Sequence, residues 1–141
     1  MSLITVIPYL SFNGQAEEAM NAYVSAFGGE IRYLSRWSKD TARKGEKQIG
    51  KVMHAEFLIG KTCFSCGDNY ENNGENTSVK LMIHMENKER AEEAIRILAE
   101  GGKVVSPLMP HPKPDDGGCG SVTMDRFGYL WIITCPNPDK E

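Results

Sequence analysis

The sequence predicts an α+β protein made of two copies of one strand–helix–strand–strand–strand module. The string Ala-Glu-Glu-Ala occurs twice, at residues 16–19 and again at 91–94. A helix-period stretch and then a Gly-Gly pair follow each copy, and a strand-like run precedes each copy. We therefore expect modules at residues 4–67 and 78–135, joined within a single domain of 141 residues.

Both helices are predicted by apolar residues that recur on one helical face. In residues 16–27 the apolar positions follow the spacing i, i+3, i+4, i+7, i+8 and i+11, and polar residues lie between them. Residues 91–99 carry a similar stripe. The expected N-caps and terminating glycines are Asn13 and Gly28 for the first helix, and Asn87 with Gly101 or Gly102 for the second.

The strands are predicted from β-prone runs bounded by turn residues. They are expected at residues 5–12, 30–37, 51–59 and 62–67 in the first half, and at 78–86, 103–106, 118–124 and 129–135 in the second. Residues 107–114 contain four prolines, so this segment is predicted to be a connecting loop or a lid, and not a central strand.

Two such modules would place curved mixed sheets around a shared cleft, with the helices outside. Alternation along residues 51–59 predicts a helix-facing set, Met53, Ala55, Phe57 and Ile59, and a cleft-facing set, Val52, His54, Glu56 and Leu58. In residues 78–86 the helix-facing set is Val79, Leu81, Ile83 and Met85, and the cleft-facing set is Lys80, Met82, His84 and Glu86. For residues 129–135, polarity leaves open whether Trp131 or Ile132 faces the cleft.

Composition excludes several classes of function. Apolar residues make up 40% of the chain, charged residues 25%, and the net charge is −3, so no basic surface for nucleic acid is expected. No apolar run reaches the length of about 18 residues that a membrane-spanning helix needs. The N-terminus does not resemble an export signal. We therefore expect a cytoplasmic protein with neither a nucleic-acid nor a membrane partner.

The four cysteines offer weak evidence for special chemistry. Cys63 and Cys66 form a C-x-x-C, but there is no second close pair to complete a zinc site. Residues three apart in a strand point to opposite faces, which also disfavours joint ligation. Reduced structural thiols are the preferred interpretation.

Several motifs together resemble one protein family. Pro-Tyr-Leu-Ser-Phe-Asn-Gly at 8–14, Ala-Glu-Glu-Ala at 16–19 and Phe-Gly-Gly-Glu at 27–30 resemble the opening of PhnB-like proteins. Val-Met-His-Ala-Glu-Phe at 52–57 resembles their third strand, and Asp68 the aspartate that closes their fourth. Asp-Arg-Phe-Gly at 125–128, followed by Trp131, resembles their final hairpin.

The resemblance implies a fold and, in part, a chemistry. It implies the vicinal oxygen chelate superfamily of glyoxalase I, extradiol dioxygenases and bleomycin-resistance proteins, and commonly a homodimer. Enzymes of that superfamily hold a divalent metal through His and Glu side chains on the first and last strands of each module. The corresponding positions here are Ile7, Tyr9 or Ser11, Phe64 or Ser65, Lys80 and Ile132, and none is a histidine or a carboxylate. No cofactor is therefore expected. A methyltransferase label also occurs around this family, but the chain lacks a glycine-rich cofactor loop.

Two residues are the best candidates for chemistry. His54 and Glu56 share a strand face, so they could act as an acid/base pair or, with His84, hold a divalent metal as the less favoured alternative. A structural hydrogen-bonded pair is the simpler interpretation. Tyr9, Lys80, His84 and Trp131 are candidate ligand-binding residues, although Tyr9 and Trp131 also suit a core. His111, among prolines, is predicted to be solvated.

The preferred hypothesis is a binding module for an unidentified small organic molecule, without the superfamily's metal. An enzyme that uses His54 and Glu56 is the first alternative, and a domain that serves only protein interaction is the second.

Overall fold

The computed structural model describes residues 4–140, which divide into two compact units between Asn72 and Asn73. Unit 1 contains β1 (Tyr9–Phe12), α1 (Ala16–Phe27), β2 (Gly29–Arg36), the 3-10 turn η1 (Glu46–Gln48), β3 (Val52–Ile59) and β4 (Thr62–Asp68). Unit 2 contains β5 (Asn76–His84), α2 (Lys88–Ala99), β6 (Lys103–Pro110), β7 (Gly118–Met124) and β8 (Tyr129–Pro136). Each unit thus has the predicted order of one strand, a helix and three strands.

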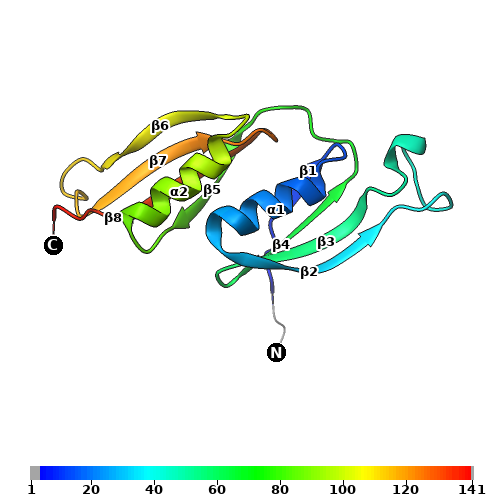
Figure 1. Ribbon diagram of the computed structural model, residues 1–141, viewed down its shortest axis with the longest axis horizontal. Helices are drawn as coiled ribbons and strands as arrows, with labels where there is room; N and C mark the ends of the chain where they lie inside the picture. Colours follow the sequence, from blue (N-terminus) through cyan, green and yellow to red (C-terminus); the bar gives the residue numbers. More distant parts are fainter. Residues whose placement is uncertain (1–3, 141) are drawn as a thin grey trace. The chain divides into compact units, whose positions relative to one another are not determined.

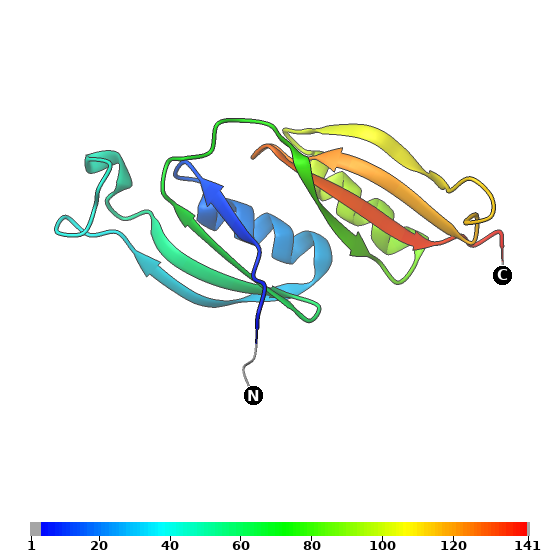
Figure 2. The same ribbon diagram turned by 180° about the vertical axis from the view of Figure 1, so that it is seen from behind.

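The two sheets have the same topology. The strand order is β1-β4-β3-β2 in unit 1 and β5-β8-β7-β6 in unit 2. The first and last strands of each unit pair in parallel, and the other neighbours pair antiparallel, so both sheets are mixed and open. Each helix packs against one face of its own sheet, and the other face carries no helix (Figures 1 and 2).

The core of unit 1 lies between α1 and the sheet. The predicted stripe of α1 is buried except at Val24, which is half-buried, and Tyr23 stacks on Phe57 with ring centroids 5.9 Å apart. The alternation predicted for β3 is confirmed at Ala55, Phe57 and Ile59, but it is wrong at its beginning, where Val52 is buried and Met53 is only half-buried. The register between β2 and β3 shifts between Ser35 and Arg36. Because of this irregularity, Val52 takes the buried position that was predicted for Met53.

The start of α1 is not capped as predicted. The side chain of Asn13 hydrogen-bonds Asn72 instead, and Gln15 at the N-cap position makes no side-chain cap. A carboxylate from the end of β4, Asp68, accepts hydrogen bonds from the backbone of the α1 start. At α2, by contrast, the predicted cap is confirmed, because Asn87 accepts from the amide of Arg90 at 2.8 Å.

In unit 2 the structure decides which face of β8 meets the helix. Trp131 and Ile133 are buried in the core, and their partners on β5 are Leu81 and Ile83. Val79 was predicted to join this set but is 74% exposed, because the β5–β8 register shifts between Asn76 and Lys80.

Two strand ends differ from the prediction by more than two residues. Residues 5–8 lie outside β1, which begins at Tyr9. β6 extends through Pro107 to Pro110, beyond the predicted end at residue 106. It can do so because β6 is an edge strand, where a proline can lie without removing a hydrogen bond from the sheet interior.

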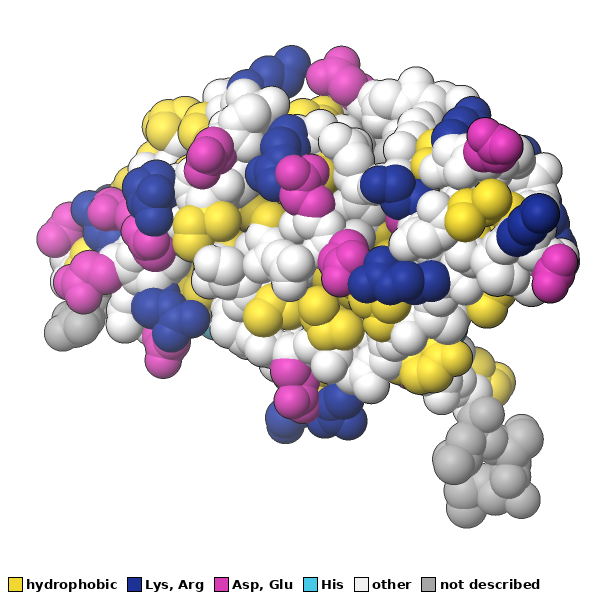
Figure 3. Space-filling view, turned by 45° about the vertical axis from the view of Figure 1, so that its right-hand side comes forward, with side chains coloured by type: hydrophobic (Ala, Val, Ile, Leu, Met, Phe, Trp, Pro, Cys, Tyr) yellow, Lys and Arg dark blue, Asp and Glu magenta, His cyan; other side chains and the backbone are white. Residues whose placement is uncertain are grey.

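The surface charge and the helices concern the nucleic-acid and membrane partners that the composition disfavours. Basic and acidic side chains are interspersed over the face in Figure 3, without a large area of one sign. Across residues 4–140, neither helix is long and apolar enough to cross a bilayer.

Candidate functional site

The candidate site lies on the helix-free face of the unit 1 sheet. His54 and Glu56 are two residues apart on β3, so both point away from α1. His54 Nε2 and Glu56 Oε2 are 3.2 Å apart, and both side chains are partly exposed. The second carboxylate oxygen of Glu56 has no hydrogen-bond partner within residues 4–140. The pair therefore keeps a free acceptor at a solvent-accessible position.

The strand register extends the site on both sides of Glu56. Tyr33 on β2 and Ser65 on β4 are its two cross-strand partners, and Tyr9 on β1 is the partner of Ser65. Cross-strand partners share a face, so Tyr33, Glu56, Ser65 and Tyr9 form one row across the four strands. We call these four residues the open-face row. His54 lies beside it, with its ring centroid 5.9 Å from that of Tyr33.

Ser65 is the unusual member of the open-face row. It is only 7% exposed, yet its hydroxyl has no hydrogen-bond partner in the described part of the chain. The hydroxyl oxygen itself is not among the fully buried unpaired atoms of the described residues, so it still reaches solvent. An accessible hydroxyl without a partner, between Glu56 and Tyr9, can hydrogen-bond a ligand group.

Tyr9 closes the row at the edge of the sheet. It is 48% exposed, and its hydroxyl lies across Gly67, since a Cβ added there would be 2.7 Å from the hydroxyl oxygen. Burial raises the pKa of Tyr9, and the nearby Cys66 and Glu71 raise it further. The phenol thus stays protonated at neutral pH and can donate a hydrogen bond.

The other predicted ligand-binding residues lie in unit 2. Lys80 and His84 are exposed on β5, and His84 Nδ1 is 2.8 Å from the hydroxyl of Thr134. Trp131 is 1% exposed beneath α2, and its indole N–H donates to Asp125 at 2.9 Å. The indole therefore belongs to the core of unit 2, on the opposite face of the sheet from Lys80 and His84.

The sequence-based prediction missed two residues of the open-face row and gave a third residue, His111, the wrong environment. Tyr33 and Ser65 could not be assigned, because their place beside Glu56 depends on strand pairing and on a register irregularity in β2. His111 was predicted to be solvated but is half-buried, with its ring over Gly118 and Gly120. The only sequence signal for this position was the pair Gly118 and Gly120, because a strand backbone without side chains leaves room for the ring of His111 to pack on it.

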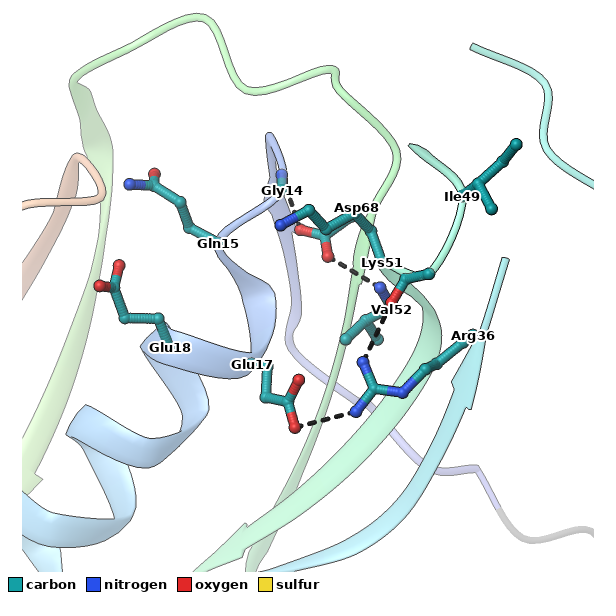
Figure 4. Close-up of a pocket in the computed structure, with 10 residues that line it drawn as sticks. Gly14, Gln15, Glu17, Glu18, Arg36, Ile49, Lys51, Val52 and Asp68 are labelled. Atoms are coloured by element: carbon teal, nitrogen blue, oxygen red, sulfur yellow. Dashed lines mark hydrogen bonds and ion pairs between the residues drawn. The ribbon is translucent and has the colours of Figure 1, made fainter. Parts of the chain in front are cut away.

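A hollow with a volume of about 660 Å³ opens at the start of α1 (Figure 4). The guanidinium of Arg36 crosses this hollow. It is 3.0 Å from the carboxylate of Glu17 and donates to the carbonyl of Gly50 at 3.1 Å. The hydrogen bond from Arg36 to Glu17 lowers the pKa of Glu17. Asp68 at its base is occupied by backbone amides. Arg36, Glu17 and Asp68 thus already have partners, so the open-face row is the better candidate.

The cysteines support the structural interpretation. Cys63 and Cys66 point to opposite faces of β4, as expected, with Leu58 and Ala55 as their respective partners. Burial, aided by the charge of Asp68, raises the pKa of Cys66 to about 12.

This burial predicts a difference in thiol reactivity. At pH 8 the thiolate fraction of a thiol with a pKa of about 12 is roughly one in ten thousand. Native protein treated with iodoacetamide should therefore be alkylated at the partly exposed Cys63 but not at Cys66, as measured by peptide mass spectrometry. Both should react in urea. Equal labelling of the two in native protein would contradict the burial of Cys66.

Comparison with solved structures places this fold. The chain is similar to a PhnB protein from Bacillus cereus, with 30% identity over 94% of this chain and 99% of that chain and a TM-score of 0.77. A protein from Pseudomonas aeruginosa is 28% identical, over 95% and 98% of the two chains, with a TM-score of 0.79. The fosfomycin resistance protein FosX from Listeria monocytogenes shares the fold at 14% identity, over 99% and 98%, with a TM-score of 0.66. No curated protein sequence matches the chain.

Fold and neighbours define a protein of the vicinal oxygen chelate superfamily. Within it, the model of the 3-demethylubiquinone-9 3-methyltransferase family matches residues 4–134. The chain belongs to this PhnB-like family.

Neither cofactor that these relationships imply fits the residues present. The superfamily positions for metal ligands on the open faces hold Tyr9 and Ser65 in unit 1, and Lys80 and Ile132 in unit 2. Phenol, hydroxyl, ammonium and aliphatic groups are poor ligands for a divalent metal. No group of three His, Cys, Asp or Glu side chains in residues 4–140 could hold an ion. The strand-to-helix turn before α1 holds Asn-Gly-Gln at 13–15, unlike the glycine-rich loop of common methyltransferases.

Proposed function

We propose that this protein binds a small organic molecule on the helix-free face of unit 1, at the open-face row, without the superfamily's metal. The observation that carries the proposal is the set of unused hydrogen-bonding groups beside the His54–Glu56 contact. The free oxygen of Glu56 and the hydroxyl of Ser65 lie on adjacent strands and have no partner in the described chain. Aromatic rings at both ends, Tyr9 and Tyr33, supply flat apolar surface.

A fragment screen by NMR tests this function. With ¹⁵N-labelled full chain, we expect fragments to shift the amides of Tyr33, Glu56 and Ser65. Glu56→Ala should weaken the best fragment about ten-fold, because a charged acceptor is lost. The control is Glu30→Ala, which removes a carboxylate of β2 that is already paired with Arg32. Fragments that shift only residues at the Arg36–Glu17 hollow would contradict this placement.

Proton-transfer catalysis is the second candidate, favoured by the 3.2 Å His54–Glu56 contact. A carboxylate that accepts a hydrogen bond from an imidazole fixes the orientation of the ring, which suits a general acid or base. If a screened fragment is consumed by the native protein, His54→Ala should abolish turnover while Glu30→Ala retains it. Self-association as a homodimer stays part of the proposal on the basis of the family resemblance, and a cytoplasmic location stays part of it as well.

A further inference from the structure

We infer that the ligand of the open-face row is a planar cation, such as an amidinium or a protonated amino-heterocycle. This inference rests on the proposed function and adds the chemical class of the ligand. It is drawn from the charges of the unit 1 sheet and from which of them are already paired.

The unit 1 sheet has no free basic side chain on its strands. Sequences of β1, β3 and β4 contain neither lysine nor arginine, and β2 contains only Arg32 and Arg36. Arg32 is paired with Glu30 at 2.7 Å, and Arg36 is paired with Glu17 on the helix side. An anionic ligand on the open face would therefore find no free lysine or arginine on these strands, and the one histidine there, His54, is already in contact with Glu56.

Negative charge, in contrast, is available on this face. Glu56 has one carboxylate oxygen in contact with His54 and the other unused. A bound cation would thus gain a charge-assisted hydrogen bond to Glu56.

The shape of the face favours a planar ligand. Between Tyr9 and Glu56 the row contains only the small residue Ser65, and the hydroxyl of Tyr9 lies over Gly67 beside it. Strands lie about 4.8 Å apart, so the row from Tyr9 to Tyr33 spans roughly 14 Å, which is enough for a ring with an aromatic neighbour on either side. A cation beside aromatic rings gains a further attraction from their π-faces.

Two probes of matched shape and opposite charge test the inference. Benzamidinium and benzoate are both a benzene ring with a planar three-atom group, and they differ in the sign of the charge. In NMR titrations of the full chain, benzamidinium should bind at least about ten times more tightly than benzoate and shift Tyr33, Glu56 and Ser65. Glu56→Gln, which keeps the shape, should remove this preference, while Glu30→Gln should retain it.

A smaller change probes the hydroxyl of Ser65. Ser65→Ala should weaken benzamidinium about three- to five-fold, because one hydrogen bond to the ligand is lost without a change of charge. Unit 2 amides serve as the internal reference for folding in every variant.

The outcomes separate the two proposals. Equal or tighter binding of benzoate, or an unchanged preference in Glu56→Gln, would overturn the cationic ligand class. If uncharged fragments shift the open-face row while benzamidinium does not, the ligand class fails and the binding function stands. If no fragment shifts the row, both proposals fail.

Discussion

Replacing Asp68 by alanine should destabilise the protein by about 3–5 kcal/mol, the largest effect expected from a single polar residue. Asp68 is 1% exposed at the end of β4. Its Oδ1 accepts from the amides of Gly14 and Ala16 at 2.8 and 3.0 Å, and its Oδ2 accepts from the amide of Val52 at 2.9 Å. Alanine would leave three backbone donors without their acceptor, at the start of α1 and at the start of β3.

Urea unfolding followed by circular dichroism measures this loss. Asp68→Asn should have a smaller effect than Asp68→Ala, because one oxygen can still accept from the helix start while the amide group opposes the Val52 donor. Asp40→Ala, in an exposed turn, is the matched control and should stay within about 0.5 kcal/mol of the native protein. Equal midpoints for the Asp68→Ala and Asp40→Ala variants would contradict the assigned role.

Trp131 should be a determinant of stability and not of ligand binding. Its side chain is the largest of the fully buried ones described, so Trp131→Ala should cost about 3–5 kcal/mol through the cavity left beneath α2. The same change also removes the donor that reaches Asp125. If alanine prevents folding, Trp131→Phe keeps most of the packing and loses the hydrogen bond to Asp125, at a cost of about 1–2 kcal/mol.

Two measurements separate these roles for Trp131. Unfolding curves give the stability order native, Trp131→Phe, Trp131→Ala. Benzamidinium titration of the folded Trp131→Phe protein should give the native affinity, because the indole has no exposed face. A large loss of affinity in a fully folded Trp131→Phe protein would return Trp131 to the list of ligand-binding residues.

The parts of the fold that the sequence predicts are those with a local signal. The helix stripes, the turn glycines and the cap at Asn87 depend on residues within a few positions of one another. Their placement is accordingly confirmed to within a residue or two for α1, β2, β3 and β7. The capping residue of α1 was missed because Asp68, which accepts from the amide of Ala16, is 52 positions away from it along the chain.

The candidate site follows the same division. His54 and Glu56 were identified because two-residue spacing in a strand is itself a local property. Tyr33 and Ser65 join them through pairing between strands, and a single irregularity in β2 changes which residues face the open side. Trp131 shows the converse, since an aromatic residue in a strand suits a core and a binding face equally until its neighbours are known.

By itself, the sequence determined the repeated module, the family resemblance and the absence of the usual metal ligands, because residue identity and spacing are sufficient for each. Only the tertiary structure decided which hydrogen-bonding groups remain unused. Whether the hydroxyl of Ser65 or the second oxygen of Glu56 has a partner depends on atoms brought close by strand pairing from distant parts of the chain. Unused hydrogen-bonding capacity is what a ligand can exploit, so the proposed site follows from packing and not from spacing.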